Sequence, residues 1–213
     1  FTIGLPARGT TFVSCFGYIA FARMVSGMGT TIFAAHSIAI TAEQIVYIPG
    51  YGLRVATSTL VGNALGEKDI RKLKATERVS ILITLLIMVV NGIGLYLFAY
   101  PFMRLFTNSV NAARIGSEML RLVSFSEPFF GLMIVLEGIS YGMGRTKHVF
   151  ACEAVSMWGI RIFGTFLCVN VFGLGLKAVW LCMIADNICK AILLYIFRPK
   201  HVEENADDRG ELR

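Results

Sequence analysis

Two glutamates lie inside the most apolar part of the stretch "RLVSFSEPFFGLMIVLEGISYGMGRTKH" (121–148). Glu127 has no basic residue three or four positions away, and Pro128 follows it. Proline disfavours helical geometry at the residue before it and frees carbonyl groups in the preceding turn. A carboxylate beside free carbonyls suits Na⁺, a proton or an organic cation, so Glu127 is a candidate ion site. The alternative, that Glu127 only hydrogen-bonds Ser124, Ser126 or a neighbouring helix, stays open.

A second polar group interrupts the apolar stretch "TAEQIVYIPGYGLR" (41–54). Glu43 and Tyr47 are four residues apart and share one face of a helix, with Gln44 beside them. A carboxylate, an amide and a phenol next to a break at Pro49 would line a cavity for cations, and the aromatic ring would add a cation–π contact. Hydrogen bonding between helices would explain the same residues equally well.

Glu137 is a further candidate for binding, ten residues after Glu127. On a straight helix the two side chains point about 80° apart and lie roughly 15 Å apart along the axis, so they cannot share one ion. We therefore favour a structural role for Glu137, bonded to Arg161 or Arg145.

The composition places these carboxylates in a membrane. Of the 213 residues, 55% are hydrophobic and 16% are charged, whereas soluble domains carry about 25% charged residues. Val79 to Met103 are 25 consecutive uncharged residues, and roughly 20 are enough to cross the hydrocarbon core. The net charge of +6 collects in loops and the tail, so it does not indicate nucleic acid. Charges inside a bilayer are costly and usually paired, and we expect Asp186 and Lys190, four residues apart, to pair along one helix.

We predict an all-α fold, a polytopic membrane bundle over residues 1–200 followed by a polar cytoplasmic tail at 201–213. The six predicted transmembrane helices are 10–27, 34–64, 79–100, 115–144, 149–172 and 178–197. The second is longer than a bilayer requires, so we expect a tilt or a hinge at Pro49, and Pro128 is the other candidate hinge. Residues 66–78 are either a short amphipathic helix at the membrane surface or a solvated loop.

Lysine and arginine are distributed unevenly between the two sets of connections. Residues 66–78, residues 145–148 and the tail from Arg198 hold eleven of them, whereas the opposite connections hold three. Basic residues are enriched in cytoplasmic loops. We therefore predict a multi-pass protein of the plasma membrane in which both ends of this chain are cytoplasmic.

The sequence lacks the motifs of enzymes, metal sites and disulfide frameworks that we considered. GxSxG, HExxH and Walker-type motifs are missing, so we expect no enzyme and no cofactor. The five cysteines lie in apolar runs without a CxxC pair, which is typical of buried thiols rather than of a metal site or disulfides. The first residue is Phe1 and no basic leader precedes the first apolar run, so we expect a fragment or a processed piece rather than a signal peptide.

Four segments resemble, in order, the multidrug and toxic compound extrusion (MATE) family of efflux transporters. They are "IGLPA" (3–7), "AAHSIAI" (34–40), "GLRVATSTLVGNALGEKDIRKLKA" (52–75) and "EPFFGLMIVLEGISYGMGRTKHVF" (127–150). The resemblance covers nearly all of residues 1–200 and implies the C-terminal six-helix lobe of a twelve-helix protein, with a missing N-terminal lobe as its partner. It also implies a multidrug antiporter, embedded in the lipid bilayer, that exports cationic drugs in exchange for Na⁺ or H⁺.

The sequence departs from the family pattern at two places that concern the ion site. Many members carry acidic residues after the "LP" of the first segment, where this chain has Arg8, Thr10 and Thr11. Many also carry a carboxylate eight residues before the signature glycine, where this chain has Phe130. The ion site is then either shifted to Glu127 or confined to the missing lobe. Two other functions stay open, a lipid-linked saccharide flippase of the same superfamily and a non-transporting membrane fragment or scaffold.

Overall fold

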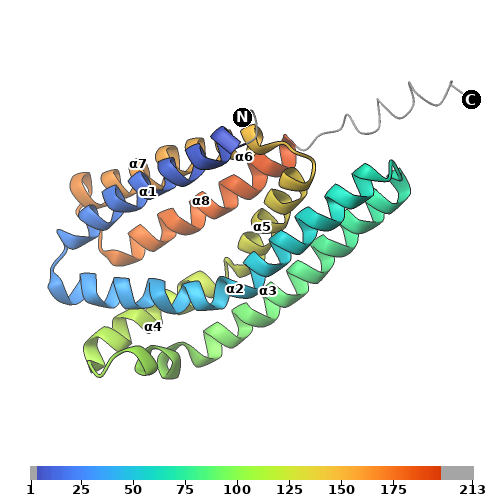
Figure 1. Ribbon diagram of the computed structural model, residues 1–213. Helices are drawn as coiled ribbons and strands as arrows, with labels where there is room; N and C mark the ends of the chain where they lie inside the picture. Colours follow the sequence, from blue (N-terminus) through green and yellow to red (C-terminus); the bar gives the residue numbers. More distant parts are fainter. Residues whose placement is uncertain (1–3, 198–213) are drawn as a thin grey trace, which may run out of the picture.

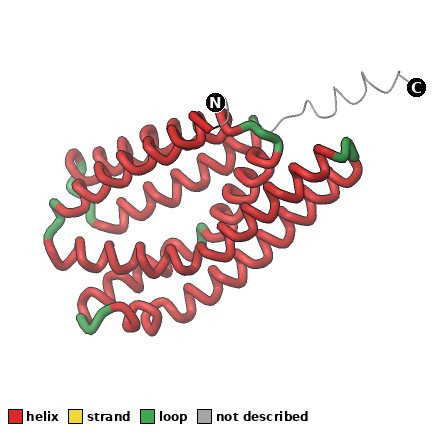
Figure 2. The backbone as a smooth tube through the Cα atoms, in the orientation of Figure 1, coloured by secondary structure: helices red, strands yellow, loops and turns green. Residues whose placement is uncertain are grey.

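The computed structural model describes the backbone of residues 4–197 and the side chains of residues 15–197, and all regular secondary structure in this part is helical (Figure 2). This confirms the predicted all-α fold, while the predicted tail at 201–213 lies outside the described residues. The α-helices and the two π-helical segments, η1 and η2, are α1 (Gly4–Ser26), α2 (Thr30–Gly66), α3 (Ile70–Phe106), α4 (Val110–Ser124), α5 (Glu127–Gly142), α6 (Thr146–Ser156), η1 (Met157–Ile162), α7 (Phe163–Phe166), η2 (Leu167–Val171) and α8 (Leu176–Ile196).

These elements run back and forth as a bundle of long rods (Figure 1). The segments from α6 to η2 follow one another without a gap and form a single rod, Thr146–Val171. This rod, α2, α3 and α8 are each long and apolar enough to cross a membrane, and the bent pair of α4 and α5 makes a fifth candidate. In α1 the described apolar stretch, Cys15–Ser26, is shorter. Length and composition are therefore those of a polytopic membrane bundle.

The outer face of α3 shows what surrounds the bundle. Leu82, Leu86, Val90, Ile93 and Leu97 follow one another at steps of about one helical turn, and all five are exposed. A continuous apolar stripe of this kind is unfavourable in water but is the expected surface in lipid.

The hairpin of α2 and α3 is longer than the sequence predicts. Each helix has 37 residues, which at 1.5 Å per residue gives roughly 55 Å, compared with about 30 Å for the hydrocarbon core. The prediction of a separate amphipathic helix or loop at 66–78 is wrong, because α3 begins at Ile70 and continues unbroken through these residues. Asp69 caps its first turn by accepting a hydrogen bond from the Lys72 amide at 2.9 Å.

The predicted helix at 115–144 is two helices. α4 and α5 are bent by 61° at a break, where the amide of Ser126 donates to the carbonyl of Val123 at 2.7 Å. Pro128 lies in the first turn of α5, where a missing amide N–H breaks no hydrogen bond. The bend thus directly precedes Pro128, which remains a candidate hinge.

Pro49 lies inside a helix that does not break. α2 continues through it, and Figure 1 shows the helix changing direction partway along its length. A proline disturbs carbonyls of the preceding turn, which need other donors inside a membrane. Asn91 of α3 supplies one, since its Nδ2 donates to the Val46 carbonyl at 3.3 Å. Pro49 likewise remains a candidate hinge.

Glycines allow α5 to approach α2 closely. A Cβ atom at Gly138 would lie 2.7 Å from the Arg54 carbonyl oxygen, and one at Gly142 would lie 2.6 Å from that of Ser58. Both distances are shorter than any side chain tolerates against backbone, so these two positions fix how α2 and α5 face each other across the site.

The connections are sorted between the two ends of the bundle. Those at 66–70 and 142–146 lie at the same end as the first turn of α1 and the last turn of α8, and those at 26–30, 106–110 and 171–176 lie at the other end (Figure 1). The Lys- and Arg-rich connections therefore share one end. Which end faces the cytoplasm stays a prediction.

Candidate functional site

A cavity of about 700 Å³ lies between α1, α2, α5, the α6–η1 rod and α8. Pockets for drug-sized molecules usually measure about 300–1,000 Å³. Aromatic side chains supply much of its wall, and those with hydroxyl groups are Tyr18, Tyr47, Tyr51 and Tyr141. Such a wall offers apolar area together with a few hydrogen-bonding groups.

The structure brings four of the predicted site residues to this cavity: Glu43, Gln44, Tyr47 and Glu137. The hydroxyl of Tyr47 donates to Oε1 of Glu43 at 2.6 Å, as their spacing on one helix face allows. The ring of Tyr47 is stacked on that of Phe130, with the centroids 3.7 Å apart. A role of these residues in binding remains a proposal.

Glu127, the fifth predicted residue, lies apart from the cavity wall. It is fully buried, and neither carboxylate oxygen has a hydrogen-bond partner among the described residues. The two serines considered as partners bond elsewhere, because Ser124 and Ser126 donate to the carbonyls of Arg121 and Val123 at 2.7 and 2.8 Å.

The surroundings of Glu127 are tight. A Cβ atom added at Gly92 of α3 would lie 3.1 Å from the Cβ atom of Glu127 and 2.8 Å from the Ser124 carbonyl oxygen. The side chain is thus enclosed between α3 and the α4–α5 break. A carboxylate enclosed without a donor is costly when charged, so this position favours a bound proton or ion over a bare negative charge.

Glu137 forms an ion pair, but with a partner that the sequence did not indicate. Its Oε2 lies 3.0 Å from Nη1 of Arg54 on α2, so the prediction of Arg161 or Arg145 is wrong. The close approach at Gly138 brings these two helices together. Arg54 and Glu137 are 83 positions apart in the sequence. Their contact depends on how two helices pack, which spacing within one helix could not reveal.

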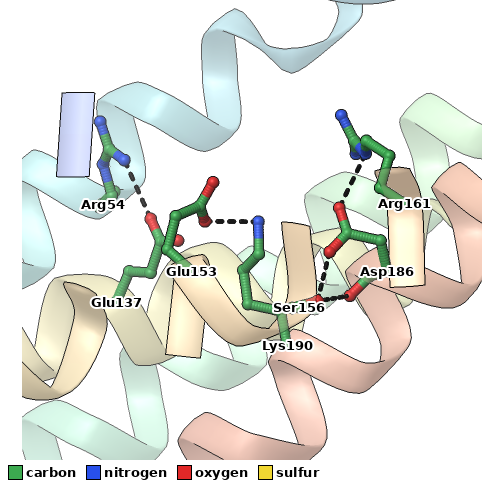
Figure 3. Close-up of polar contacts among 7 residues, drawn as sticks. All are labelled: Arg54, Glu137, Glu153, Ser156, Arg161, Asp186 and Lys190. Atoms are coloured by element: carbon green, nitrogen blue, oxygen red, sulfur yellow. Dashed lines mark hydrogen bonds and ion pairs between the residues drawn. The ribbon is translucent and has the colours of Figure 1, made fainter. Parts of the chain in front are cut away.

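Asp186 and Lys190 do not pair with each other, which corrects the prediction. Nε of Arg161 lies 2.8 Å from Oδ2 of Asp186, and Nζ of Lys190 lies 2.5 Å from Oε2 of Glu153 (Figure 3). Ser156 also donates to Asp186 through its hydroxyl group.

These cross-helix pairs leave a signal in the sequence that our prediction missed. Along α6 and η1 the order is acid, then base; along α8 it is also acid, then base. Because the two rods are antiparallel in the bundle (Figure 1), the acid of each faces the base of the other. The opposite order of charges on two neighbouring antiparallel helices is compatible with both pairs, although the residues are eight positions apart on one rod and four apart on the other.

The cavity wall is balanced in charge except at one carboxylate. Its basic side chains are Arg54, Arg161 and Lys190, and each forms an ion pair with a carboxylate. Glu43 also lines the cavity, and among the described residues its hydrogen-bond partner is the Tyr47 hydroxyl rather than a base. Glu43 is therefore the wall position best able to accept a cation.

The residues that replace the family's acidic residues after the first segment have no described side chains, and the described residues form no metal cluster. Arg8, Thr10 and Thr11 lie outside the side chains that the structure describes. Among the described residues, no group of three or more His, Cys, Asp and Glu side chains could hold a metal ion. Sodium at Glu127 therefore stays a proposal.

The apolar rods, the bend between α4 and α5 and the cavity are those of a polytopic helical membrane bundle with room for a small molecule. The chain belongs to the MatE family, whose sequence model matches residues 6–167.

Curated relatives agree with this assignment. The chain is 30% identical over 197 residues to a probable multidrug resistance protein NorM of Thermotoga maritima, covering 92% of the chain and 42% of that protein. It is 28% identical to a probable NorM of Photorhabdus laumondii, covering 92% of the chain and 44% of the relative. The chain therefore spans less than half the length of the relatives it matches.

Solved structures show the same fold. A MATE protein crystallised in a straight conformation superimposes with a TM-score of 0.86 at 20% identity, over 96% of this chain and 46% of that one. A MOP superfamily transporter from Pyrococcus furiosus gives a TM-score of 0.85 at 17% identity, over 92% and 44%. The chain thus has the fold of one lobe, as the resemblance implied.

Proposed function

We propose that the complete protein is a secondary active multidrug antiporter of the plasma membrane, to which this chain contributes one six-helix lobe. It exports organic cations in exchange for Na⁺ or H⁺, with both ends of the chain in the cytoplasm. The names of the NorM relatives support drugs as substrates, and the wide cavity supports a binding site for them.

The observation that carries this proposal is the state of Glu43. It lines the cavity without a basic partner among the described residues, beside a stacked pair of aromatic rings. A cation entering here gains a charge–charge interaction with the carboxylate and cation–π contacts with the rings. Because Glu43 is almost fully buried, the attraction is stronger than at a protein surface.

Glu127 is proposed as the position that takes up the coupling ion. It is enclosed and unpartnered, so it is stable only when neutralised, and it lies apart from the cavity wall. Drug and coupling ion would then occupy different places in the lobe, which allows exchange rather than simple competition for one carboxylate.

Binding of ethidium, a fluorescent organic cation, to the purified complete protein tests the proposal. Replacing Glu43 with Gln keeps the shape and removes the charge, and we expect binding to weaken about tenfold, or about 1.4 kcal/mol. The matched control is Glu118→Gln on α4, which removes an exposed carboxylate paired with Lys177. Equal ethidium affinity in both variants and the wild type would contradict a cation site at Glu43.

The charge balance also separates the antiporter from the saccharide flippase. A lipid-linked saccharide carries phosphate groups, and their binding favours several unpaired basic side chains. All three basic side chains of this wall are already in ion pairs. A headgroup translocation assay with the complete protein would decide against the antiporter if it showed flipping and ethidium did not bind.

A further inference from the structure

We propose that Cys168 and Cys182 form a redox site, a pair of thiols that a disulfide reagent oxidises to a reversible cross-link between η2 and α8. Neither residue lines the cavity, so this site is separate from the one proposed for drugs. The contact between the two sulfur atoms, and the end of the bundle at which they lie, support this site.

The two thiols are in contact with each other across the interface between η2 and α8. Sγ of Cys168 lies 3.8 Å from Sγ of Cys182, and both residues are half-buried. The sulfur atoms of a disulfide lie about 2.05 Å apart, and rotation about the Cα–Cβ bonds moves a sulfur atom on the scale of the missing distance. The pair can therefore close by a change of side-chain rotamers.

The packing around the pair holds both cysteines in place. Gly164 lies about one turn before Cys168 on the same rod, and a Cβ atom there would lie 3.3 Å from Sγ of Cys182, so the glycine leaves room for this thiol. Cys168 lies in the π-helical segment η2, and its carbonyl accepts a hydrogen bond from the Leu174 amide at 2.7 Å. Thiols that are held side by side in this way react with each other far faster than thiols on separate flexible segments.

The pair lies near the end of the bundle that has few basic residues. Cys168 is in the last helical segment before the connection at 171–176, and Cys182 is within the first two turns of α8 (Figure 1). The distribution of lysine and arginine predicts that this end faces outward, where disulfides form and persist. Cys152 and Cys189 lie nearer the opposite ends of the same two rods, where a cytoplasmic setting keeps thiols reduced.

Thiol–disulfide exchange supplies the chemistry of the cross-link. The thiolate of one cysteine attacks a small-molecule disulfide, whose S–S bond breaks and releases one thiol. The thiolate of the second cysteine attacks the mixed disulfide, forms the bond between Cys168 and Cys182, and releases the second thiol. The cysteines lose two electrons and two protons, which the two released thiols carry away. The new bond joins residues 14 positions apart and pins the end of the rod to α8.

Bis(2-hydroxyethyl) disulfide, a small uncharged disulfide, tests the site on the purified complete protein in detergent. Mass spectrometry of the digested protein should find the peptides of Cys168 and Cys182 linked, and dithiothreitol should separate them. Because a cross-link restricts the unfolded chain, we expect the oxidised protein to unfold about 5 °C higher than the reduced one. Cys182→Ser should abolish both the link and the rise in unfolding temperature.

Cys189→Ser is the matched control, because it removes another half-buried thiol of α8. It should keep both the link and the rise. A wild type without linked peptides, a link that requires Cys189, or equal unfolding temperatures before and after oxidation would overturn the inference. None of these results bears on ethidium binding at Glu43, so the inference and the proposed function fail separately.

Alkylation of intact cells with N-ethylmaleimide before lysis tests whether the pair is oxidised where the protein works. We expect the peptides of Cys168 and Cys182 to be linked without any added reagent, while Cys189 is alkylated or free. Alkylation of all three cysteines would place the pair in a reducing compartment and overturn its oxidation in the cell.

Discussion

Glu137 and Glu127 lie on the same helix, α5, in opposite surroundings. Glu137 lines a cavity and bonds Arg54 at 3.0 Å, whereas Glu127 is fully buried and its oxygens have no partner among the described residues. The first is explained by structure alone, since a base compensates its charge. The second has no structural explanation, and an uncompensated carboxyl in a membrane bundle is where ion uptake is expected.

The same contrast divides the remaining charged groups. Asp186 and Lys190 are almost fully buried and each has a partner on the neighbouring rod. Removing one member of a buried pair strands the other, while removing an unpaired carboxyl strands nothing. The two kinds of residue should therefore respond in opposite ways to neutral substitutions, and the following variants test this difference.

The largest effect on stability is expected for Asp186→Ala. It leaves Arg161 buried without its carboxylate partner and removes one of the two acceptors of the Ser156 hydroxyl, so the loss should be about 3–5 kcal/mol. Unfolding of the complete protein in detergent measures it. The double variant Asp186→Ala with Arg161→Leu should recover part of the loss, and no recovery would mean that the pair is not the cause.

A smaller loss of stability is expected from a substitution where α2 and α5 meet. Gly138→Ala places a methyl group 2.7 Å from the Arg54 carbonyl oxygen, which should separate the helices and cost about 1–3 kcal/mol. Gly94→Ala on α3 is the control, because a Cβ there meets nothing within 4 Å. Equal unfolding temperatures for both variants would show that the close approach does not exist.

The smallest effect is expected at the bundle surface. Lys177 and Glu118 form an ion pair at 3.1 Å, but their side chains are 71% and 45% exposed. Lys177→Ala should therefore change the free energy of unfolding by less than about 0.5 kcal/mol. A loss as large as that of Asp186→Ala would mean that burial does not separate the two classes of pair.

Much of the fold follows from the sequence, because lipid imposes a simple rule on each segment. The uncharged run from Val79 to Met103 predicts a spanning helix, and α3 contains it. The start of α3 at Ile70 was missed because its first turns are charged, although they lie on the same continuous helix. The break before Glu127 was predicted only as a candidate hinge at Pro128, because a proline alone does not show whether a helix bends or ends.

The candidate site was predictable only within single helices. Glu43 and Tyr47 were placed together correctly, since their contact depends on spacing along α2. The partner of Glu137 was not predicted correctly. Its contact with Arg54 depends on the register between α2 and α5, which Gly138 sets. Arg161 was considered as a possible partner of Glu137, whereas its partner is Asp186 on α8, a contact that depends on the packing of two rods.

The most direct test of the contrast on α5 is ethidium extrusion by the complete protein with Glu127→Gln, beside Glu137→Gln and the wild type. Imposed Na⁺ and H⁺ gradients should be applied separately, with protein amounts and unfolding temperatures measured in parallel. We expect Glu127→Gln to lose extrusion under whichever gradient drives the wild type without losing stability, and Glu137→Gln to lose stability while retaining part of its transport. Wild-type extrusion and unchanged ion dependence in Glu127→Gln would contradict the assignment of ion uptake to Glu127.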